Sequence, residues 1–170
     1  MSAEFLENVV SRSGRAVAWL TIAMVLLTFA IVLMRYGFNL GWIWFQESVS
    51  YLHATVFMVA AAWALQEDAH VRVDVFYRNA SPRRQAWVNL LGTLLLLMPV
   101  CIFLLVTGWD YVIRSWQVLE GSREAGGLPL VFLLKTLILV LPGLLMIQAI
   151  ANVRRHWSNI RLLPGSQGGR

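Results

Sequence analysis

Cysteine and lysine are almost missing from this 170-residue chain, which contains one of each, Cys101 and Lys135. A single cysteine excludes a disulfide or a cysteine metal site within the chain, and its place in an apolar run predicts a buried small side chain. Acidic residues are also scarce, and none lies in the interior of the four longest apolar runs. Intramembrane transport sites are usually marked by such acids, so the sequence does not indicate one.

The composition excludes an ordinary soluble domain. Hydrophobic residues make up 58% of the chain, charged residues make up 14%, and the mean hydropathy is +0.64, which is typical of an integral membrane protein. The net charge is +5, but the arginines cluster at the ends of apolar runs and form no continuous stripe. That distribution favours membrane topology over nucleic-acid binding. We expect an uncleaved first transmembrane helix, because no small-residue cleavage site follows a short apolar core.

Four apolar runs predict an all-α membrane protein whose transmembrane helices form two hairpins within one membrane domain, 1–170. The first run has 19 residues between Arg15 and Arg35; as a helix it would be about 28 Å long, close to the thickness of a bilayer core. Pro99 predicts a kink in the third helix, and we expect the basic tail to be flexible. The predicted helices span 16–34, 46–65, 84–107 and 128–153, and the predicted flexible tail spans 157–170.

The segments between these helices have their own signals. Residues 36–45 are rich in tryptophan and other aromatics, which predicts an interfacial belt or a short surface helix. Residues 109–119 are expected to extend the third helix beyond the lipid. Small residues four apart in the second helix, 50 with 54 and 60 with 64, predict close approach of another helix. No internal repeat is present.

Basic residues are distributed unequally among the loops, which predicts orientation. Ten arginines lie in the N-terminal segment, the central loop and the tail, and three lie in the other two loops. Because loops rich in basic residues stay in the cytoplasm, both termini and the central loop are expected there.

Two polar residues within the runs need an explanation. Lys135 must either extend its ammonium group toward the interface or meet a partner. His53 lies inside the second helix, where we expect a polar contact between helices. A haem-bearing or plain membrane anchor of an oxidoreductase is an alternative, but a bis-histidine haem needs a second histidine at matching depth, and none is present. A small four-helix exporter is another alternative, although the first helix lacks the acid that such exporters use.

The central segment, 66–85, concentrates charge between the second and third helices. Val71, Val73 and Val75 alternate with Arg72 and Asp74. This alternation is typical of an amphipathic segment at the membrane surface and favours that interpretation over a metal site. Arg72 and Asp74 are close enough in sequence to pair, which makes them candidates for fixing the loop against a partner protein.

The segment Glu-Asp-Ala-His-Val-Arg-Val-Asp-Val-Phe, 67–76, resembles the signature of the small membrane subunit of tripartite ATP-independent periplasmic (TRAP) transporters, the DctQ-like family. Other residues fit that pattern in order: Gln46-Glu47-Ser48, Ser122, Gly127-Leu128-Pro129, Pro142-Gly143 and Gln148. The resemblance covers about residues 15–156.

The resemblance implies a multi-pass subunit of a bacterial inner membrane, without enzyme activity or cofactor, that pairs with a large multi-span membrane subunit. That larger subunit would carry out sodium-coupled uptake of an organic acid, which a periplasmic binding protein delivers. The small subunit would act as a membrane scaffold in contact with lipid and would offer part of the docking surface. The candidate contact residues are Glu47, His70, Arg72, Asp74, Arg114, Arg123 and Lys135.

Overall fold

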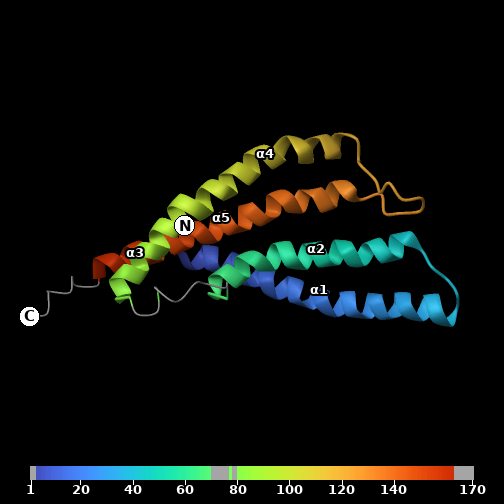
Figure 1. Ribbon diagram of the computed structural model, residues 1–170, viewed down its shortest axis with the longest axis horizontal. Coiled ribbons are helices and arrows are strands. Elements are labelled where there is room, and N and C mark those ends of the chain that lie inside the picture. Colours follow the sequence, from blue (N-terminus) through green and yellow to red (C-terminus); the bar gives the residue numbers. More distant parts are fainter. Residues whose placement is uncertain (1–2, 70–76, 78–79, 163–170) are drawn as a thin grey trace, which may run out of the picture.

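The computed structural model describes residues 3–69, 77 and 80–162. Every regular element in that part of the chain is helical, and α3, η1 and α4 follow one another without a break (Figure 1). The described residues therefore form four long helices, each apolar enough to cross a membrane. The predicted all-α membrane fold is confirmed. The elements are α1 (Ala3–Gly37), α2 (Ile43–Gln66), α3 (Pro82–Gly92), the π-helical segment η1 (Thr93–Leu97), α4 (Met98–Gln117) and α5 (Val131–Leu162).

The helices extend beyond the limits that hydropathy predicts. Helix α1 begins thirteen residues before the predicted start at residue 16, and α5 continues to Leu162. Residues 157–162, predicted as part of a flexible tail, are therefore helical, and 163–170 lie outside the described residues. The difference has a physical reason: hydropathy marks the part of a helix that lies in lipid, whereas a helix can continue into water when neighbouring helices pack against it.

The third long helix contains an irregular turn near its proline. In η1 the N–H of Met98 donates to the carbonyl of Thr93, five residues earlier. Pro99 follows directly and has no N–H to donate, so the carbonyl of Leu95 lacks its normal partner. The kink predicted at Pro99 stays a prediction, and what the structure adds is a π-helical segment directly before this proline. Beyond it α4 continues to Gln117, which confirms the predicted extension past residue 109.

Helix α5 is the centre of the arrangement. Among the described residues it contacts α1, α2, α3 and α4, whereas α4 contacts neither α1 nor α2. In Figure 1 the long helices lie side by side in the order α4, α5, α2, α1. We call the end with the 38–42 and 118–130 connections the hairpin-loop end, and the end with the start of α3 the central-loop end. Toward the hairpin-loop end the helices form a row, whereas at the central-loop end α1 also contacts α5.

Buried residues concentrate toward the central-loop end, where α1, α2, α3 and α5 come together. They include Val10, Ala62, Leu90, Ala149 and Ala151. Toward the hairpin-loop end, burial is confined to a stripe of α4 that faces α5 and repeats every three to four residues; its members are Cys101, Gly108, Val112 and Ser115. The predicted burial of Cys101 is confirmed.

Two glycines allow the closest helix contacts. A Cβ on Gly14 of α1 would lie 2.5 Å from the ring of Trp63 in α2, and a Cβ on Gly108 would lie 3.3 Å from Ile138 and Leu139 in α5. In the contact of α1 with α2 the small residue, Gly14, lies on α1 and the large one, Trp63, on α2. Close approach at the small-residue pairs of α2, 50 with 54 and 60 with 64, stays a prediction. In lipid, small residues at such points let two backbones approach.

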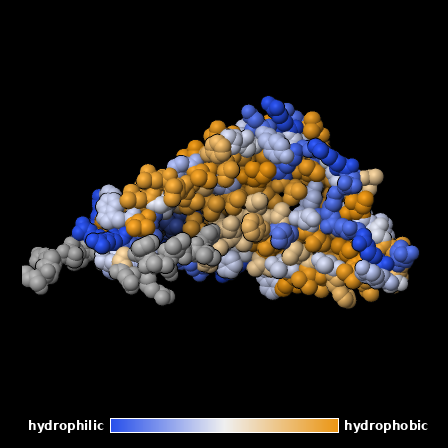
Figure 2. Space-filling view, viewed as in Figure 1, coloured by the Kyte–Doolittle hydropathy of each residue, from blue (hydrophilic) through white to orange (hydrophobic). Residues whose placement is uncertain are grey.

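The surface is apolar in its middle and polar toward its ends (Figure 2). At the hairpin-loop end the rings of Trp42, Trp44 and Phe45 form a cluster with centroids 5.2 to 6.5 Å apart. The predicted aromatic belt is therefore present, but the separate surface helix is not: Trp44 and Phe45 belong to the first turn of α2.

Candidate functional site: a loop-anchoring cluster at the hairpin-loop end

The loop 118–130 is fastened to α2 by one carboxylate. Glu47, in the second turn of α2, accepts a hydrogen bond of 2.5 Å from the Ser122 hydroxyl and one of 2.7 Å from the backbone N–H of Leu128. Seventy-five and eighty-one residues separate these partners from Glu47 in the sequence. Because both carboxylate oxygens are used, this side chain joins the α1–α2 hairpin to the α4–α5 hairpin.

The loop also requires a glycine at position 127, next to Glu47. A Cβ at Gly127 would overlap the Ser122 side chain and lie 2.8 Å from a Glu47 oxygen, so only glycine fits there. Trp44, at the start of α2, donates its N–H to the Gly126 carbonyl over 3.2 Å. That bond satisfies one of the N–H groups that every helix start leaves without an internal partner.

A second acidic residue holds the same loop on α4 and α5. Glu120 accepts a bond of 2.5 Å from Lys135 Nζ and one of 2.8 Å from the Ser115 hydroxyl. Lys135 also lies over the Tyr111 ring, 4.1 Å from its centroid, a cation–π contact. The bond from Lys135 and then that from Ser115 hold the pKa of Glu120 below its ordinary value. We call Glu47, Ser115, Glu120, Ser122 and Lys135 the loop-anchoring cluster.

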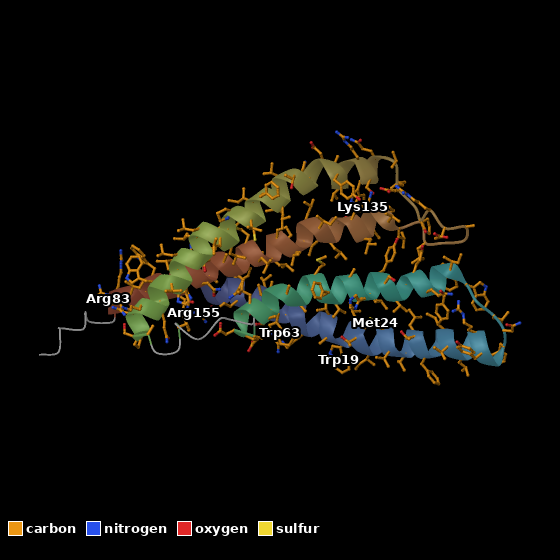
Figure 3. The ribbon with its side chains drawn as sticks, viewed as in Figure 1. Trp19, Met24, Trp63, Arg83, Lys135 and Arg155 are labelled. Atoms are coloured by element: carbon orange, nitrogen blue, oxygen red, sulfur yellow. The ribbon has the colours of Figure 1, made fainter. Side chains whose placement is uncertain are left out.

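The polar groups of this cluster are used to anchor the loop. Its carboxylates are hydrogen-bonded. Its lysine, Lys135, lies at the hairpin-loop end (Figure 3) and is paired with Glu120. No group of three metal-ligating side chains occurs within the described residues. What the arrangement provides is a loop of fixed shape at one end of the membrane span.

The structure separates the sequence-predicted contact residues into three groups. Glu47 and Lys135 are used inside the chain, in the loop-anchoring cluster. Arg114 and Arg123 are exposed at the same end. His70, Arg72 and Asp74 lie outside the described residues.

The structure decides the roles expected of Lys135 and His53, the two polar residues within the apolar runs. Of the two possibilities for Lys135, extension toward the interface or a partner, the structure shows a partner, Glu120. His53 is exposed and stacks on Phe57 of its own helix, with centroids 6.4 Å apart, so the expected contact with another helix of this chain is wrong. A signal for the Lys135 pair was present, because a lysine near a helix start and an acid in the preceding loop lie on the same side of the membrane.

Sequence analysis missed a polar pair within α5. Gln148 is fully buried and donates its amide to Asn152 Oδ1 over 3.1 Å. Its own Oε1 has no partner. The i, i+4 spacing of two amides on an apolar helix could have indicated this pair.

Comparison with known proteins supplies the family. The model of the DctQ component of tripartite ATP-independent periplasmic transporters matches residues 24–159. The chain belongs to the DctQ family. No solved structure matches it.

Two DctQ-like relatives are named as small permease proteins. The C4-dicarboxylate TRAP transporter small permease protein DctQ of Vibrio cholerae is 35% identical over 89 residues, which is 52% of this chain and 38% of the relative. A protein provisionally named TRAP transporter small permease protein, from Haemophilus influenzae, is 32% identical over 107 residues, which is 62% of this chain and 63% of the relative. The chain thus spans less than two thirds of each relative.

The residues that carried the DctQ resemblance meet in the structure. Glu47, Ser122, Gly127 and Leu128 come from two separate parts of the motif pattern and form one set of contacts at the hairpin-loop end. Their common task is to fasten the loop 118–130 to α2.

Proposed function

We propose that this DctQ-family chain is the membrane scaffold of a secondary transporter and binds a large multi-span subunit that moves the substrate. The observation that carries the proposal is the match to the family over most of the chain. The form of the molecule supports it, because a row of helices with broad apolar faces suits a partner laid along it, and the described cationic residue inside the spans, Lys135, is paired internally.

The complete transporter would take up an organic acid together with sodium. A periplasmic binding protein would deliver the substrate, and the large subunit would hold the substrate and sodium sites. In this proposal both termini lie in the cytoplasm of a bacterial cell and the hairpin-loop end reaches the periplasm. The arginine distribution supports this orientation.

Co-expression with a large TRAP membrane subunit tests the proposal. Affinity purification of this chain should recover the large subunit in equal amount, and reconstituted uptake should require both. Arg72→Ala and Asp74→Ala should leave membrane insertion intact, weaken co-purification and lower uptake, because a desolvated charge at an interface is costly once its partner is removed. Full uptake by the large subunit alone would refute the scaffold role, and full assembly of both variants would refute the role of the central loop.

Orientation has a separate test. A cysteine introduced at Gly165, which lies outside the described residues, should react with a membrane-impermeant reagent only after the inner membrane is opened. The native Cys101, which is 1% exposed, should stay unreactive in both conditions and so serves as the internal control. Labelling in cells with only the outer membrane permeable would reverse the proposed topology.

A further inference from the structure

Helix α2 has one exposed stripe in the part that crosses the membrane. From residue 45 to residue 66 its exposed side chains are those of Ser50, His53 and Phe57. Positions three and four apart lie on the same side of a helix, so these side chains form one line, which we call the α2 stripe. Because α1 and α5 contact α2 from its two sides in the row (Figure 1), the α2 stripe lies on a broad face of the molecule.

The α2 stripe lies at mid-depth in the span. His53 is ten residues after Ile43, where α2 begins, and thirteen before Gln66, where it ends. At 1.5 Å per residue its backbone is about 15 Å from the start of the helix, half the thickness of a bilayer core of about 30 Å. Of the four candidate spans, α2 is also the least apolar. An acyl chain at this depth offers no hydrogen bond, so lipid alone is a poor neighbour for the imidazole.

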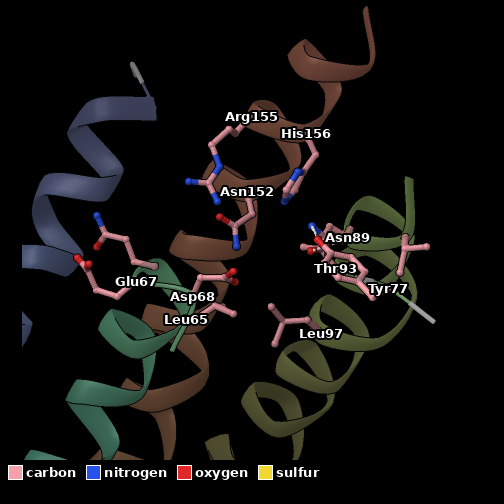
Figure 4. Close-up of a pocket in the computed structure, with 13 residues that line it drawn as sticks. Leu65, Glu67, Asp68, Tyr77, Asn89, Thr93, Leu97, Asn152, Arg155 and His156 are labelled. Atoms are coloured by element: carbon pink, nitrogen blue, oxygen red, sulfur yellow. Dashed lines mark hydrogen bonds between the residues drawn. The ribbon is translucent and has the colours of Figure 1, made fainter. Parts of the chain in front are cut away.

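The polar groups of the α2 stripe lack partners within the described part of the chain. His53 stacks on Phe57, but neither its imidazole nor the Ser50 hydroxyl makes a hydrogen bond there. By contrast, Asn89 in α3 donates its amide to Tyr77 Oη over 2.8 Å (Figure 4). Several threonines donate to the carbonyl four residues earlier, namely Thr28, Thr55, Thr93, Thr107 and Thr136. A serine can make the same bond by rotating its side chain, so His53 is the group that needs a partner from outside.

The α2 stripe has the features of a surface that receives another transmembrane helix. A neutral imidazole presents one N–H donor and one acceptor nitrogen, which a hydroxyl, amide or carboxylate on a neighbouring helix can satisfy. Ser50, one turn before His53, belongs to the small-residue pair 50 with 54, whose spacing lets a second helix approach closely. Phe57 is 64% exposed and offers a ring that such a helix would cover.

A second copy of this chain fits the α2 stripe less well than a different protein does. Because the arginine bias sets the orientation, copies of this chain insert the same way. A symmetric pair would then place each residue of the stripe opposite itself at the same depth. Two Phe57 rings would face each other, and bulky side chains at a crossing point hold helix backbones apart. A different protein can place a small residue against Phe57 and a polar one against His53.

We propose that a transmembrane helix of the large multi-span subunit packs on the α2 stripe, with a polar side chain hydrogen-bonded to His53 and a small residue against Phe57. This contact, which presupposes the proposed function, sets the face and the depth at which the two subunits meet. The partner therefore lies on one broad face of the row at mid-depth, whereas the predicted role of Arg72 and Asp74 concerns the central loop.

The test measures the dissociation constant between this full-length chain and a large TRAP membrane subunit, both purified in one detergent. His53→Leu should weaken binding about three- to twentyfold, the range expected for one hydrogen bond between transmembrane helices. His53→Gln keeps a donor and an acceptor and should keep most of the affinity. Both variants should unfold at the wild-type temperature when the chain is alone, because the side chain is exposed.

The aromatic part of the α2 stripe has a matched control. Phe57→Ala should weaken binding, whereas Phe103→Ala should not, although both rings are 64% exposed. Phe103 follows the buried Cys101 of α4 by two residues, or about 200° around the helix, so it points away from α5 at the outer edge of the row.

A photoreactive benzophenone amino acid at position 57 identifies the neighbour directly. A cross-link to the large subunit is expected. A cross-link to a second copy of the chain, or lipid adducts alone, would overturn the assignment of the partner. If the wild type binds and His53→Leu and Phe57→Ala bind as tightly as Phe103→Ala, the α2 stripe is not the contact and the scaffold role still stands. Absence of binding by the wild type would refute both.

Discussion

Single residues set the distance between helices in this protein. The contact of Gly14 with Trp63 is the tightest at any described helical glycine, since the nearest ring atom would be 2.5 Å from an added Cβ. At that separation neither α1 nor α2 can keep its place if a methyl group is added. The crossing point of the first hairpin is therefore specified by one glycine and one tryptophan.

Gly14→Ala should lower the stability of the chain by about 1–3 kcal/mol, the usual cost of overpacking. Gly143→Ala in α5 is the matched control, because nothing lies within 4 Å of its Cβ position. Thermal unfolding in one detergent, followed by size-exclusion chromatography, measures both variants. If the two variants unfold at the same temperature, the Gly14–Trp63 contact is not a limiting feature of the fold.

Glu47 should determine how rigidly the loop 118–130 is held. In Glu47→Ala the Leu128 N–H and the Ser122 hydroxyl lose their acceptor, so we expect faster amide hydrogen exchange in 121–130, measured by mass spectrometry. Glu124→Ala removes an exposed carboxylate of the same loop and should leave exchange near the wild-type rate. Similar acceleration in both variants would mean that the loop responds to its net charge and not to this anchor.

The sequence identified some residues of the loop-anchoring cluster but not their contacts. Glu47 was identified because an acid at a helix start is noticeable, and Lys135 because a lysine in an apolar run is costly. The contacts of Glu47 were not identified, because Ser122 and Leu128 are more than seventy residues away in the sequence and no local pattern encodes such a pairing.

At the scale of elements, the long third helix depends on an extra residue in η1. Both α3 and α4 contact α5, and each does so through its own buried stripe. An α-helix advances 100° per residue, so the π-helical turn sets the rotation of one stripe relative to the other. The sequence predicted a kink at Pro99, but it could not predict the π-helical segment before it, because that segment depends on which faces must meet α5.

Deleting Leu95 should convert η1 into a regular helical turn and rotate α3 by about 100° relative to α4. The two buried stripes could then not face α5 together, so we expect a large loss of thermal stability. Leu95→Ala is the control, since this side chain is 67% exposed and its loss does not change the register. A deletion variant as stable as Leu95→Ala would show that η1 does not determine the alignment.

At the scale of the whole molecule, the hairpin-loop end combines a rigid loop with free charges. Glu120 is engaged by Lys135 and Ser115, so the exposed residues Arg114, Arg123 and Glu124 remain for docking a binding protein. Hydropathy and arginine counts were enough to predict the four spans. They could not show that these spans form an open row, because each run is apolar on nearly all sides and periodicity does not select a face.

Reversing the charges of Arg114, Arg123 and Glu124 together should raise the concentration of binding protein needed for half-maximal uptake and weaken its dependence on salt. The control reverses Arg83 and Arg84 at the central-loop end, which a periplasmic protein cannot reach in the proposed orientation. Unchanged uptake kinetics in the triple variant would exclude these charges from docking.

The row of helices also has a mechanical consequence. Toward the hairpin-loop end the layer is one helix thick, so no second layer of this chain stands behind it to oppose bending across its flat faces. At the hairpin-loop end Glu47 joins the α1–α2 hairpin to the α4–α5 hairpin. At the central-loop end the contacts among α1, α2 and α5 hold the hairpins together. A second body laid against the broad face would supply the resistance to bending that the layer lacks, and the joined structure would be stiffer than either part alone.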